Sequence, residues 1–532
     1  MSENETPQTD AKVSAKASEA SAKASVADAQ VAPSPAAVDP RRWVALIVLL
    51  VATFMDAVDV TVVNIAIPHI QEDTGASTSQ IQWVVGGYAL AFALGLITGG
   101  RLGDLYGRKK VFLAGVAGFT LTSLVCGIAG APEMLLAGRI AQGAAAALMV
   151  PQVLSIIHVS FPKEERGKVF GIFGAVSSLG VLAGPLVGAL LVEGDLFGMG
   201  WRPIFLVNLP LGVIGLIAGA VLIRESKAER AARLDVGGMV LSTGGLLCLV
   251  LPLIQGRELG WPVWTYVMMA ASVPVLALFV AYERRVIARG GSPLVVLSLF
   301  TRKSFSGGLG VQLMFGLASG VFFLAWALYL QLGLGFSPLK AGLSGLPLSL
   351  LLMVGAGVSM QVLVPRFGRR VLQAGALTAA AGMVLFAWLT GHYGADITLW
   401  QTMLPLAPMG IGMGLIVAPL TDIILSEVPH EHAGSASGLN NTTVQLGQAV
   451  GTALSSLIFF NQLGDNPVTQ GAKMPDAFAH TLPYVAAAFL TSFALLYAIP
   501  KRAGHKSGDA GGNPEGDKTG TPAEAAGPAL TR

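Results

Sequence analysis

The chain of 532 residues is too apolar for a soluble protein, because 53% of its residues are hydrophobic and only 12% are charged. Soluble domains carry about 25% charged residues, and here the apolar residues come in long blocks separated by short basic loops. The formal net charge is +3, but the basic residues stand at the ends of apolar blocks rather than on one face, so we expect no nucleic-acid partner. The composition predicts an all-α protein that crosses a membrane many times.

The two cysteines, Cys126 and Cys248, lie in separate apolar blocks without metal-ligand spacing, so we expect neither a metal site nor a disulfide framework. Both ends of the chain differ from its apolar middle. Residues 1–40 are rich in Ala, Ser and Lys and lack the apolar region of a signal peptide, and residues 501–532 are rich in Gly, Pro, Ala and Asp. These compositions predict a disordered tail at each end.

Long apolar runs that end at charged residues, glycine or proline predict the membrane-crossing helices in chain order. A helix of about 20 apolar residues spans a hydrocarbon core of about 30 Å. The sequence has fourteen such runs, at residues 43–67, 81–100, 110–130, 133–157, 168–191, 201–223, 235–255, 262–282, 305–330, 338–363, 370–390, 399–426, 438–460 and 482–499. An even number of crossings places both ends of the chain on one side of the membrane.

Basic residues identify that side, since cytoplasmic loops carry an excess of Lys and Arg. They gather at every second connection, at Arg41 and Arg42, Arg108 to Lys110, Lys163 to Lys168, Arg224 to Arg233, Arg284 to Arg289, Arg302 and Lys303, Arg366 to Arg370, and Lys501 and Arg502. The opposite connections carry mainly acidic residues, with Arg257 and Lys473 as isolated exceptions. We therefore expect a multi-pass protein of the cytoplasmic cell membrane with both termini in the cytoplasm.

The chain contains an internal repeat. A shift of 267 residues aligns four glycines of one predicted helix with four of another, placing Gly167, Gly171, Gly180 and Gly184 on Gly434, Gly438, Gly447 and Gly451. Four matches in one register indicate a duplicated unit. We expect an N-terminal six-helix bundle at 41–224, an inserted pair of helices with linkers at 225–300, and a C-terminal six-helix bundle at 301–500.

Two aspartates stand inside the first apolar run, where ionisation is costly and a charge usually has a function. At about 1.5 Å per residue, Asp59 and Arg139 lie at similar depths below the outer ends of their helices, so they are predicted to pair. A conformational change that separates them would alter the proton affinity of Asp59. Asp56 lies one turn further in, as a second proton site or as a counter-charge for a cationic substrate. Static structural roles are the alternative.

Several stretches resemble motifs of the major facilitator superfamily, in particular of its fourteen-helix drug:proton antiporters. The loop from Gly100 to Lys110, GRLGDLYGRKK, is similar to the signature between helices 2 and 3. The segments DVTVVNIAIP from Asp59 and RIAQG from Arg139 resemble the motifs of helix 1 and helix 4, and GVLAGPLVG from Gly180 resembles the antiporter motif. The similarity extends from about residue 43 to residue 500.

The resemblance implies the major facilitator fold, with two six-helix bundles plus two inserted central helices. It also implies that the helix 2–3 loop forms a cytoplasmic gate, built here by Gly100, Asp104, Gly107, Arg108 and Lys109. The glycines permit a tight turn, and Asp104 can accept hydrogen bonds from a nearby helix N-terminus. Plain cytoplasmic topology would explain the basic residues but neither Asp104 nor the glycine spacing.

The antiporter motif implies a helix that packs between the two halves and limits leakage. Gly180, Gly184 and Gly188 recur at every fourth residue, so they share one helix face and permit close approach of another backbone. Pro185 removes a backbone donor and is expected to kink the helix. Ordinary packing of small residues is the alternative reading of this face.

Four polar side chains inside apolar runs are candidates for the lining of a substrate cavity. Asn64 and Gln142 belong to the helix 1 and helix 4 motifs, and Asn441 and Gln445 lie near the inner end of the run 438–460. Hydrogen bonds between packed helices are an equally open role for the last two. The stretch around them resembles a family motif that usually has Arg where Val444 stands here, so a charge is absent.

These features favour a secondary active exporter that confers resistance by moving a hydrophobic or amphipathic small molecule, such as a drug, an antibiotic or a related metabolite, outward in exchange for protons. Proton coupling is assigned to Asp59, Arg139 and Asp56. The sequence has no P-loop, so the proton gradient rather than ATP is the expected energy source, and no cofactor is expected. The expected partners are the substrate, protons and the lipid bilayer, without an obligate protein partner.

Other functions stay open. The chain can be a dedicated exporter of one endogenous metabolite, such as a self-made antibiotic, or a sensor or scaffold. An importer is disfavoured by the antiporter motif. An integral-membrane transferase would need a nucleophile, an acid–base cluster or a metal site near one interface, and the short outer loops hold only scattered His and acidic residues. We therefore expect no enzyme.

Overall fold

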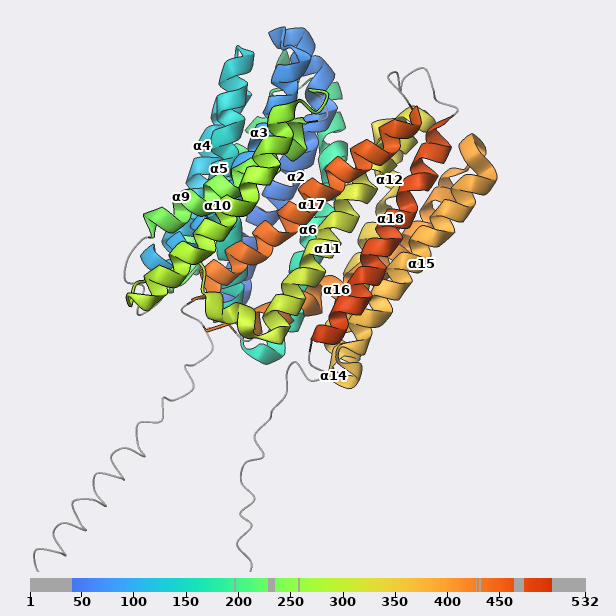
Figure 1. Cartoon of the computed structure of the whole chain (residues 1–532). Coiled ribbons are helices and arrows are strands. Elements are labelled where there is room, and N and C mark those ends of the chain that lie inside the picture. Colours follow the sequence, from blue (N-terminus) through green and yellow to red (C-terminus); the bar gives the residue numbers. More distant parts are fainter. Residues whose placement is uncertain are drawn as a thin grey trace, which may run out of the picture.

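The computed structural model describes residues 41–195, 198–227, 235–256, 259–426, 428–429, 432–463 and 473–499 (Figure 1). Within these ranges the regular elements are all helices, which confirms the predicted all-α class. The tails predicted to be disordered, 1–40 and 501–532, lie outside the described residues, as does part of the linker after residue 227.

The first six predicted crossings correspond to seven helices. They are α2 (Arg42–Thr74), α3 (Thr78–Tyr106), α4 (Arg108–Gly127), α5 (Pro132–Ser160), α6 (Lys163–Glu193), α7 (Pro203–Leu206) and α8 (Asn208–Leu222). Their ends follow local sequence signals. The first turn of α3 is closed by Ser77 and Gln80, each of which bonds the backbone N–H of the other, and α5 begins at a proline that needs no N–H partner.

The inserted pair consists of α9 (Val236–Gln255) and α10 (Val263–Ala288). The last six crossings contain α11 (Lys303–Leu328), α12 (Pro338–Ser344), α13 (Leu346–Val358), α14 (Val364–Phe367), α15 (Arg370–Tyr393), α16 (Leu399–Ser426), α17 (Ala433–Leu463) and α18 (Met474–Leu495). Short helical turns join or extend them, namely η2 (Leu297–Thr301), η3 (Tyr329–Gly333), η4 (Ser359–Leu363), η5 (Gly394–Asp396) and η9 (Leu496–Ala498).

Thirteen helical stretches among the described residues are long and apolar enough to cross a membrane. They match thirteen of the predicted crossings, and the remaining one, α17, is not in this set although it has 31 residues. Polar side chains from Asn440 to Gln448 interrupt its apolar character. The membrane-spanning class is thus confirmed, and the number of fourteen crossings stays a prediction.

Two predicted crossings are broken rather than continuous. The sixth divides at Val207 into α7 and α8, and the tenth divides near Gly345 into α12 and α13. In each case a proline, Pro210 or Pro347, stands in the first turn of the second piece and supplies no N–H to the preceding turn. Other helices are longer than their apolar runs, because charged ends such as the start of α6 continue the helix beyond the apolar stretch.

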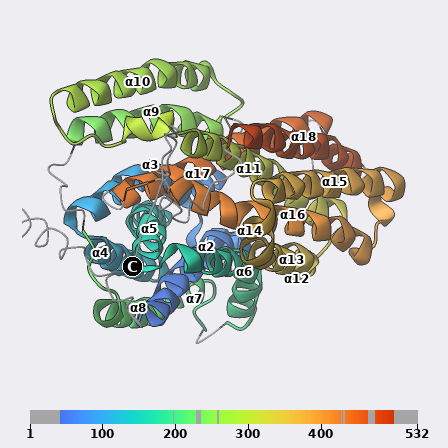
Figure 2. The same cartoon turned by 90° about the horizontal axis from the view of Figure 1, so that it is seen from below.

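The long helices run side by side between two ends of the molecule (Figure 1). We call the end at which α2 begins and α18 ends the terminal end, and the opposite one the distal end. Seen from below, α9 and α10 lie as a pair along one edge, next to α3, α17 and α11 (Figure 2). The pair packs mainly through α9, which contacts α3 and α17.

The aligned glycines make corresponding contacts in the two halves. On α6, a Cβ at Gly180 or Gly184 would meet α2, the first helix of the same half, whereas Gly167 faces η4 of the other half. On α17, Gly447 and Gly451 approach α11, the first helix of the second half, and Gly434 and Gly438 approach α3 of the first half. Each of these helices therefore joins its own half to the other one.

Candidate functional site

The core of the candidate site is a buried ion pair between α2 and α5. The Arg139 guanidinium donates from Nη1 to Asp59 Oδ2, and the two side chains are 1% and 0% exposed. The depths predicted from helix geometry thus bring these residues into contact. A buried ion pair is stable only when further hydrogen bonds satisfy the remaining atoms of both groups.

Two amide side chains supply bonds to the carboxylate, and a hydroxyl group holds both amides. Gln142, one turn beyond Arg139, accepts from Arg139 Nη1 at 2.6 Å and donates to Asp59 Oδ1 at 2.9 Å. Asn208, the first residue of α8, also donates to Asp59 Oδ1 at 2.9 Å, and both amides contact the Ser123 hydroxyl of α4. Side chains of α5 and α8 therefore meet at the α2 carboxylate, and Ser123 of α4 joins the two amides.

Arg139 is held from its other sides by carbonyl and aromatic groups. Its Nε donates to the Val84 carbonyl at 3.3 Å, and its guanidinium carbon lies 4.3 Å from the centre of the Tyr88 ring and 5.7 Å from that of Phe205. An aromatic face attracts a desolvated cation, so these rings stabilise the charged form of Arg139 in an apolar region.

Asp56 does not share the ion pair. Its Oδ1 accepts a hydrogen bond from the Tyr88 hydroxyl of α3, and its side chain is half-buried whereas Asp59 is fully buried. The two aspartates thus have different environments on one helix. Tyr88 joins Asp56 to Arg139, because its hydroxyl bonds the carboxylate and its ring lies against the guanidinium.

The gating loop contains a second buried ion pair, at the terminal end. Asp104 Oδ1 accepts from Arg108 Nη2 at 2.8 Å and from the backbone N–H of Gly434 at 2.9 Å, while Oδ2 accepts the N–H of Ser435 at 2.9 Å. Those N–H groups belong to the first turn of α17, whose N-terminus attracts a negative charge. Asp104 therefore fastens the first half to the second through a helix N-terminus.

The surrounding glycines make this contact possible. The φ angle of Gly107 is 107°, which a residue with a Cβ rarely adopts, and the chain turns there from α3 into α4. A Cβ at Gly100 would overlap the carbonyl oxygen of Gly434, so the backbones of α3 and α17 touch at this point. Gly107 is needed for its backbone conformation and Gly100 for its lack of a side chain.

The segment after α8 also holds the gating loop. The backbone N–H groups of Lys109 and Lys110 donate to the carboxylate of Glu225 at 3.1 and 3.3 Å, and the N–H of Arg108 donates to the Ser226 carbonyl at 3.0 Å. The Lys109 ammonium donates to the carbonyl of Ala220. The first turn of α4 is thus capped by the linker that leads to the inserted helix pair.

The antiporter-motif glycines lie against α2. A Cβ at Gly184 would overlap Thr61 Oγ1, one at Gly180 would lie 2.7 Å from the Ala57 Cβ, and one at Gly188 would lie 3.1 Å from Val62. The helix α6 continues as one element from Lys163 to Glu193 through Pro185, and its other contacts include α12, α13 and α16 of the second half. The glycine face therefore packs within the first half, while the helix as a whole lies between the halves.

The substrate-cavity candidates are not brought together. Gln142 belongs to the Asp59 network, and Asn64, further along α2, has an exposed side chain. Gln445 is half-buried on α17, and Asn441 Nδ2 is buried there without a hydrogen-bond partner. The latter two lie in the second half and make no contact with the Asp59 network.

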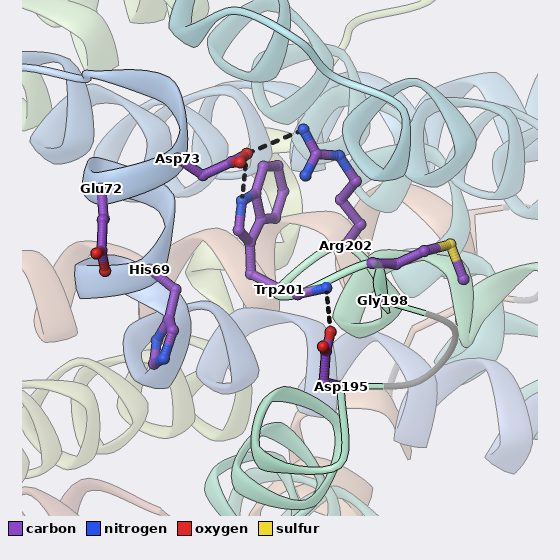
Figure 3. A pocket seen from close by; sticks show the side chains of 9 residues that line it. His69, Glu72, Asp73, Asp195, Gly198, Trp201 and Arg202 are labelled. Carbon is purple, nitrogen blue, oxygen red and sulfur yellow. Dashed lines mark hydrogen bonds and ion pairs between the residues drawn. The ribbon is translucent and has the colours of Figure 1, made fainter.

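A separate pocket of about 540 Å³ opens at the distal end (Figure 3). Asp73, near the end of α2, accepts from the Trp201 indole at 3.1 Å and from Arg202 at 2.9 Å, and the Gly200 N–H donates to Asp195 at 2.8 Å. The pocket contains none of the predicted site residues. Its His69 lies about 15 Å along α2 from Asp59, at 1.5 Å per residue, so the pocket is no part of the ion-pair site.

Several residues of the site were not predicted from the sequence, namely Ser123, Asn208, Tyr88, Glu225 and Ser435. Asn208 carried a signal, since an amide inside an apolar segment needs a hydrogen-bond partner. Tyr88 and Ser123 carried none, because single hydroxyl groups are common in membrane helices. Ser435 and Glu225 act where distant segments meet, which no local pattern indicates.

Comparison with known proteins places these motifs in a family context. The model of the Major Facilitator Superfamily matches residues 49–452. The probable actinorhodin transporter of Streptomyces coelicolor is 46% identical over 424 residues, which are 80% of this chain and 73% of that protein. The tetracenomycin C resistance and export protein of Streptomyces glaucescens is 37% identical over 80% of this chain and 77% of its own length.

A solved structure shares the fold. The human organic anion transporter MFSD10 (TETRAN) superposes with a TM-score of 0.61, over 86% of this chain and all of that one, with 16% sequence identity. At that identity the likeness concerns the fold alone. The shared fold is consistent with two groups of membrane-spanning helices that pack side by side in this chain.

Proposed function

Because the chain belongs to the Major Facilitator Superfamily, whose members are membrane transporters of small molecules, we propose that it exports a hydrophobic or amphipathic small molecule in exchange for protons. The relatives named as antibiotic transport, export and resistance proteins support the outward direction and the class of substrate. We expect the terminal end to face the inside of the cell, because basic loops predict the cytoplasmic side of the membrane.

The observation that carries the proton coupling is the hydrogen-bonded ion pair at Asp59. A proton on this carboxylate neutralises it and weakens its attraction for Arg139, which then keeps only Gln142, the Val84 carbonyl and aromatic neighbours. Arg139 is thereby released to move relative to α2. Proton binding and helix movement become one event, which is the requirement for an antiporter.

Contacts between the halves support a mechanism of alternating access. In this structure Asp104 binds the start of α17 at the terminal end, so opening to the cytoplasm requires that Gly434 and Ser435 leave the carboxylate. We assign this contact as the cytoplasmic gate. Substrate entering from the cytoplasm or the inner leaflet favours the open gate, and protonation of Asp59 from outside favours the return.

Transport in inside-out vesicles tests the proposal. We expect uptake of actinorhodin or tetracenomycin C to require an imposed proton gradient and to stop when an uncoupler is added. Asp59→Asn should abolish gradient-driven uptake while facilitated equilibration down a substrate gradient continues. Gradient-driven uptake that persists in Asp59→Asn would show that Asp59 is not the coupling carboxyl.

A dedicated exporter of a single compound is the second candidate, favoured because each of the two relatives is named for one antibiotic. A panel of lipophilic cations, dyes and unrelated antibiotics separates the two functions. Resistance restricted to one chemical series supports the dedicated exporter. Resistance to several unrelated series supports a multidrug pump.

A further inference from the structure

A second buried acidic pair lies in the inserted helices, far from the Asp59 network. Asp235 precedes α9 and caps it, because its Oδ1 accepts the N–H of Gly238 at 2.8 Å. Glu283 lies in the last turns of α10, and its Oε1 accepts the N–H of Leu294 at 3.2 Å. The two residues are 7% and 0% exposed, so both carboxyl groups are removed from water.

The two carboxyl groups face each other across Gly238. A Cβ on that glycine would lie 2.6 Å from Glu283 Oε1 and 2.7 Å from Asp235 Oδ2, and the carboxyl groups are within hydrogen-bonding reach of one another. Each also retains one buried oxygen without a partner, Asp235 Oδ2 and Glu283 Oε2. Two ionised carboxylates in this arrangement would repel each other, whereas one proton between them gives a hydrogen bond.

No cation neutralises the pair among the described residues. Tyr282 donates its hydroxyl to Asp235 at 3.0 Å, and Arg289, at the end of α10, is exposed and makes no ion pair with either acid. Of the helices packed on α9, α17 carries no charged residue, and α3 carries Arg101 and Asp104, neither of which contacts the pair. Among the described residues, binding of a proton is therefore the means by which one of the two negative charges is removed.

We propose that Asp235 and Glu283 hold one proton between them, and that this proton fastens the inserted helix pair to the segment that leads into the second half. The proton comes from water, and no other bond forms or breaks. Its loss leaves two like charges in an apolar place, which drives the start of α9 and the end of α10 apart. The inserted pair thereby acquires a proton-binding site that is independent of transport at Asp59.

Glu283 also holds the segment that leads from α10 into the second half. Leu294, whose N–H binds Glu283, is fully buried, and with Val295 it packs into an apolar cluster that includes Ile97 of α3 and Phe279 of α10. The residues that follow form η2 and lead directly into α11. Separation of the acidic pair would therefore shift the Glu283 carboxylate that holds Leu294, and this movement would loosen the packing of the connection between the inserted pair and the second half.

Infrared spectroscopy of the full-length protein in lipid nanodiscs tests the shared proton. On titration from neutral to alkaline pH we expect the parent to lose the C=O stretching band of one protonated carboxyl per chain. Asp235→Asn and Glu283→Gln should each lack that loss, because the amide donates to the remaining carboxylate. Asp476→Asn, a change at an exposed acid of α18, should retain it. Full loss of the band in both pair variants would overturn the proposal.

Hydrogen exchange of the parent alone gives a second readout that does not depend on how the variants fold. After correction for the intrinsic rate, we expect protection of residues 291–301 to fall over the same pH interval in which the carboxyl band disappears. Where the double variant D235N/E283Q folds, its protection should not change over that interval. Unchanged protection of this segment in the parent would show that the pair does not hold the connection.

Discussion

The hydroxyl of Tyr88 donates a hydrogen bond to Asp56, and the face of the same ring lies 4.3 Å from the Arg139 guanidinium. One side chain of α3 therefore contacts both the inner aspartate and the partner of the outer one. Tyr88 is uncharged, so it joins Asp56 to Arg139 through the position of its side chain and not through an ion pair. It gives Asp56 a means to influence the Asp59 pair without an ion pair of its own.

We predict that Asp56 and Tyr88 act as one unit. Tyr88→Phe removes the hydroxyl but keeps the ring on Arg139, so its effect on the efflux rate should equal that of Asp56→Asn, and the double variant should be no worse than either change alone. Efflux rates of the four forms measure this coupling. Additive losses would mean that the two side chains act separately.

Loss of Arg139 should leave an uncompensated buried charge on Asp59. We expect Arg139→Gln to lower the free energy of unfolding by about 3–5 kcal/mol at neutral pH. Most of the deficit should be recovered in D59N/R139Q, because a neutral Asn at position 59 needs no cation. Thermal unfolding of the parent and both variants measures it. A double variant as unstable as Arg139→Gln alone would contradict the assignment of the charge to Asp59.

The contact between Asp104 and α17 should control access at the terminal end. Asp104→Asn weakens charge-assisted bonds to the N–H groups of Gly434 and Ser435, at a cost of about 1.4 kcal/mol, which corresponds to about a tenfold larger open fraction. Ser155 is buried against the Ala433 carbonyl, so S155C in a chain without its native cysteines reports opening by its rate of maleimide labelling.

Ser435→Ala is the matched control for the gate. It removes only the hydroxyl that lies 3.2 Å from Asp104 Oδ2 and leaves both backbone bonds, so the labelling rate should rise much less. Equal labelling rates in the parent and in Asp104→Asn would remove Asp104 from the gate.

The glycine face of α6 should be intolerant of a methyl group at one position and tolerant at another. Gly184→Ala places a Cβ on Thr61 Oγ1 and should lower stability by about 1–3 kcal/mol, with partial rescue by Thr61→Ala. Gly174→Ala on the same helix meets nothing within 4 Å and should be neutral or slightly stabilising. Melting temperatures of the purified variants provide the comparison, and equal changes in the two variants would show that the contact with Thr61 does not determine the effect.

The sequence predicted what depends on local periodicity and left open what depends on packing. Helical rise was enough to place Asp59 and Arg139 at one depth, and the shared glycine spacing of α6 and α17 was enough to recognise two related helices. The amide of Asn208 indicated the need for a hydrogen-bond partner but not which one, because its position depends on a helix break at Val207 and on the angle at which α8 packs on α4. Local patterns contain neither quantity.

Packing between distant segments also could not be predicted for the proposed gate or for the residues proposed to line a substrate cavity. The chemistry of Asp104 predicted an acceptor for a helix N-terminus, but not that this helix begins 330 residues further along the chain. Asn441 and Gln445 were grouped with Asn64 and Gln142 by polarity alone, and the structure separates them into different halves. A polar residue in a membrane helix is unusual, but its polarity does not identify the residue that it contacts.

The Asp59 carboxylate accepts three hydrogen bonds, so a proton that binds it competes with these donors. Its Oδ2 accepts Arg139, and its Oδ1 already accepts both Gln142 and Asn208. In the proposed mechanism a proton takes the place of Arg139 on Oδ2. That one oxygen atom would then couple protonation of Asp59 to the position of α5 relative to α2.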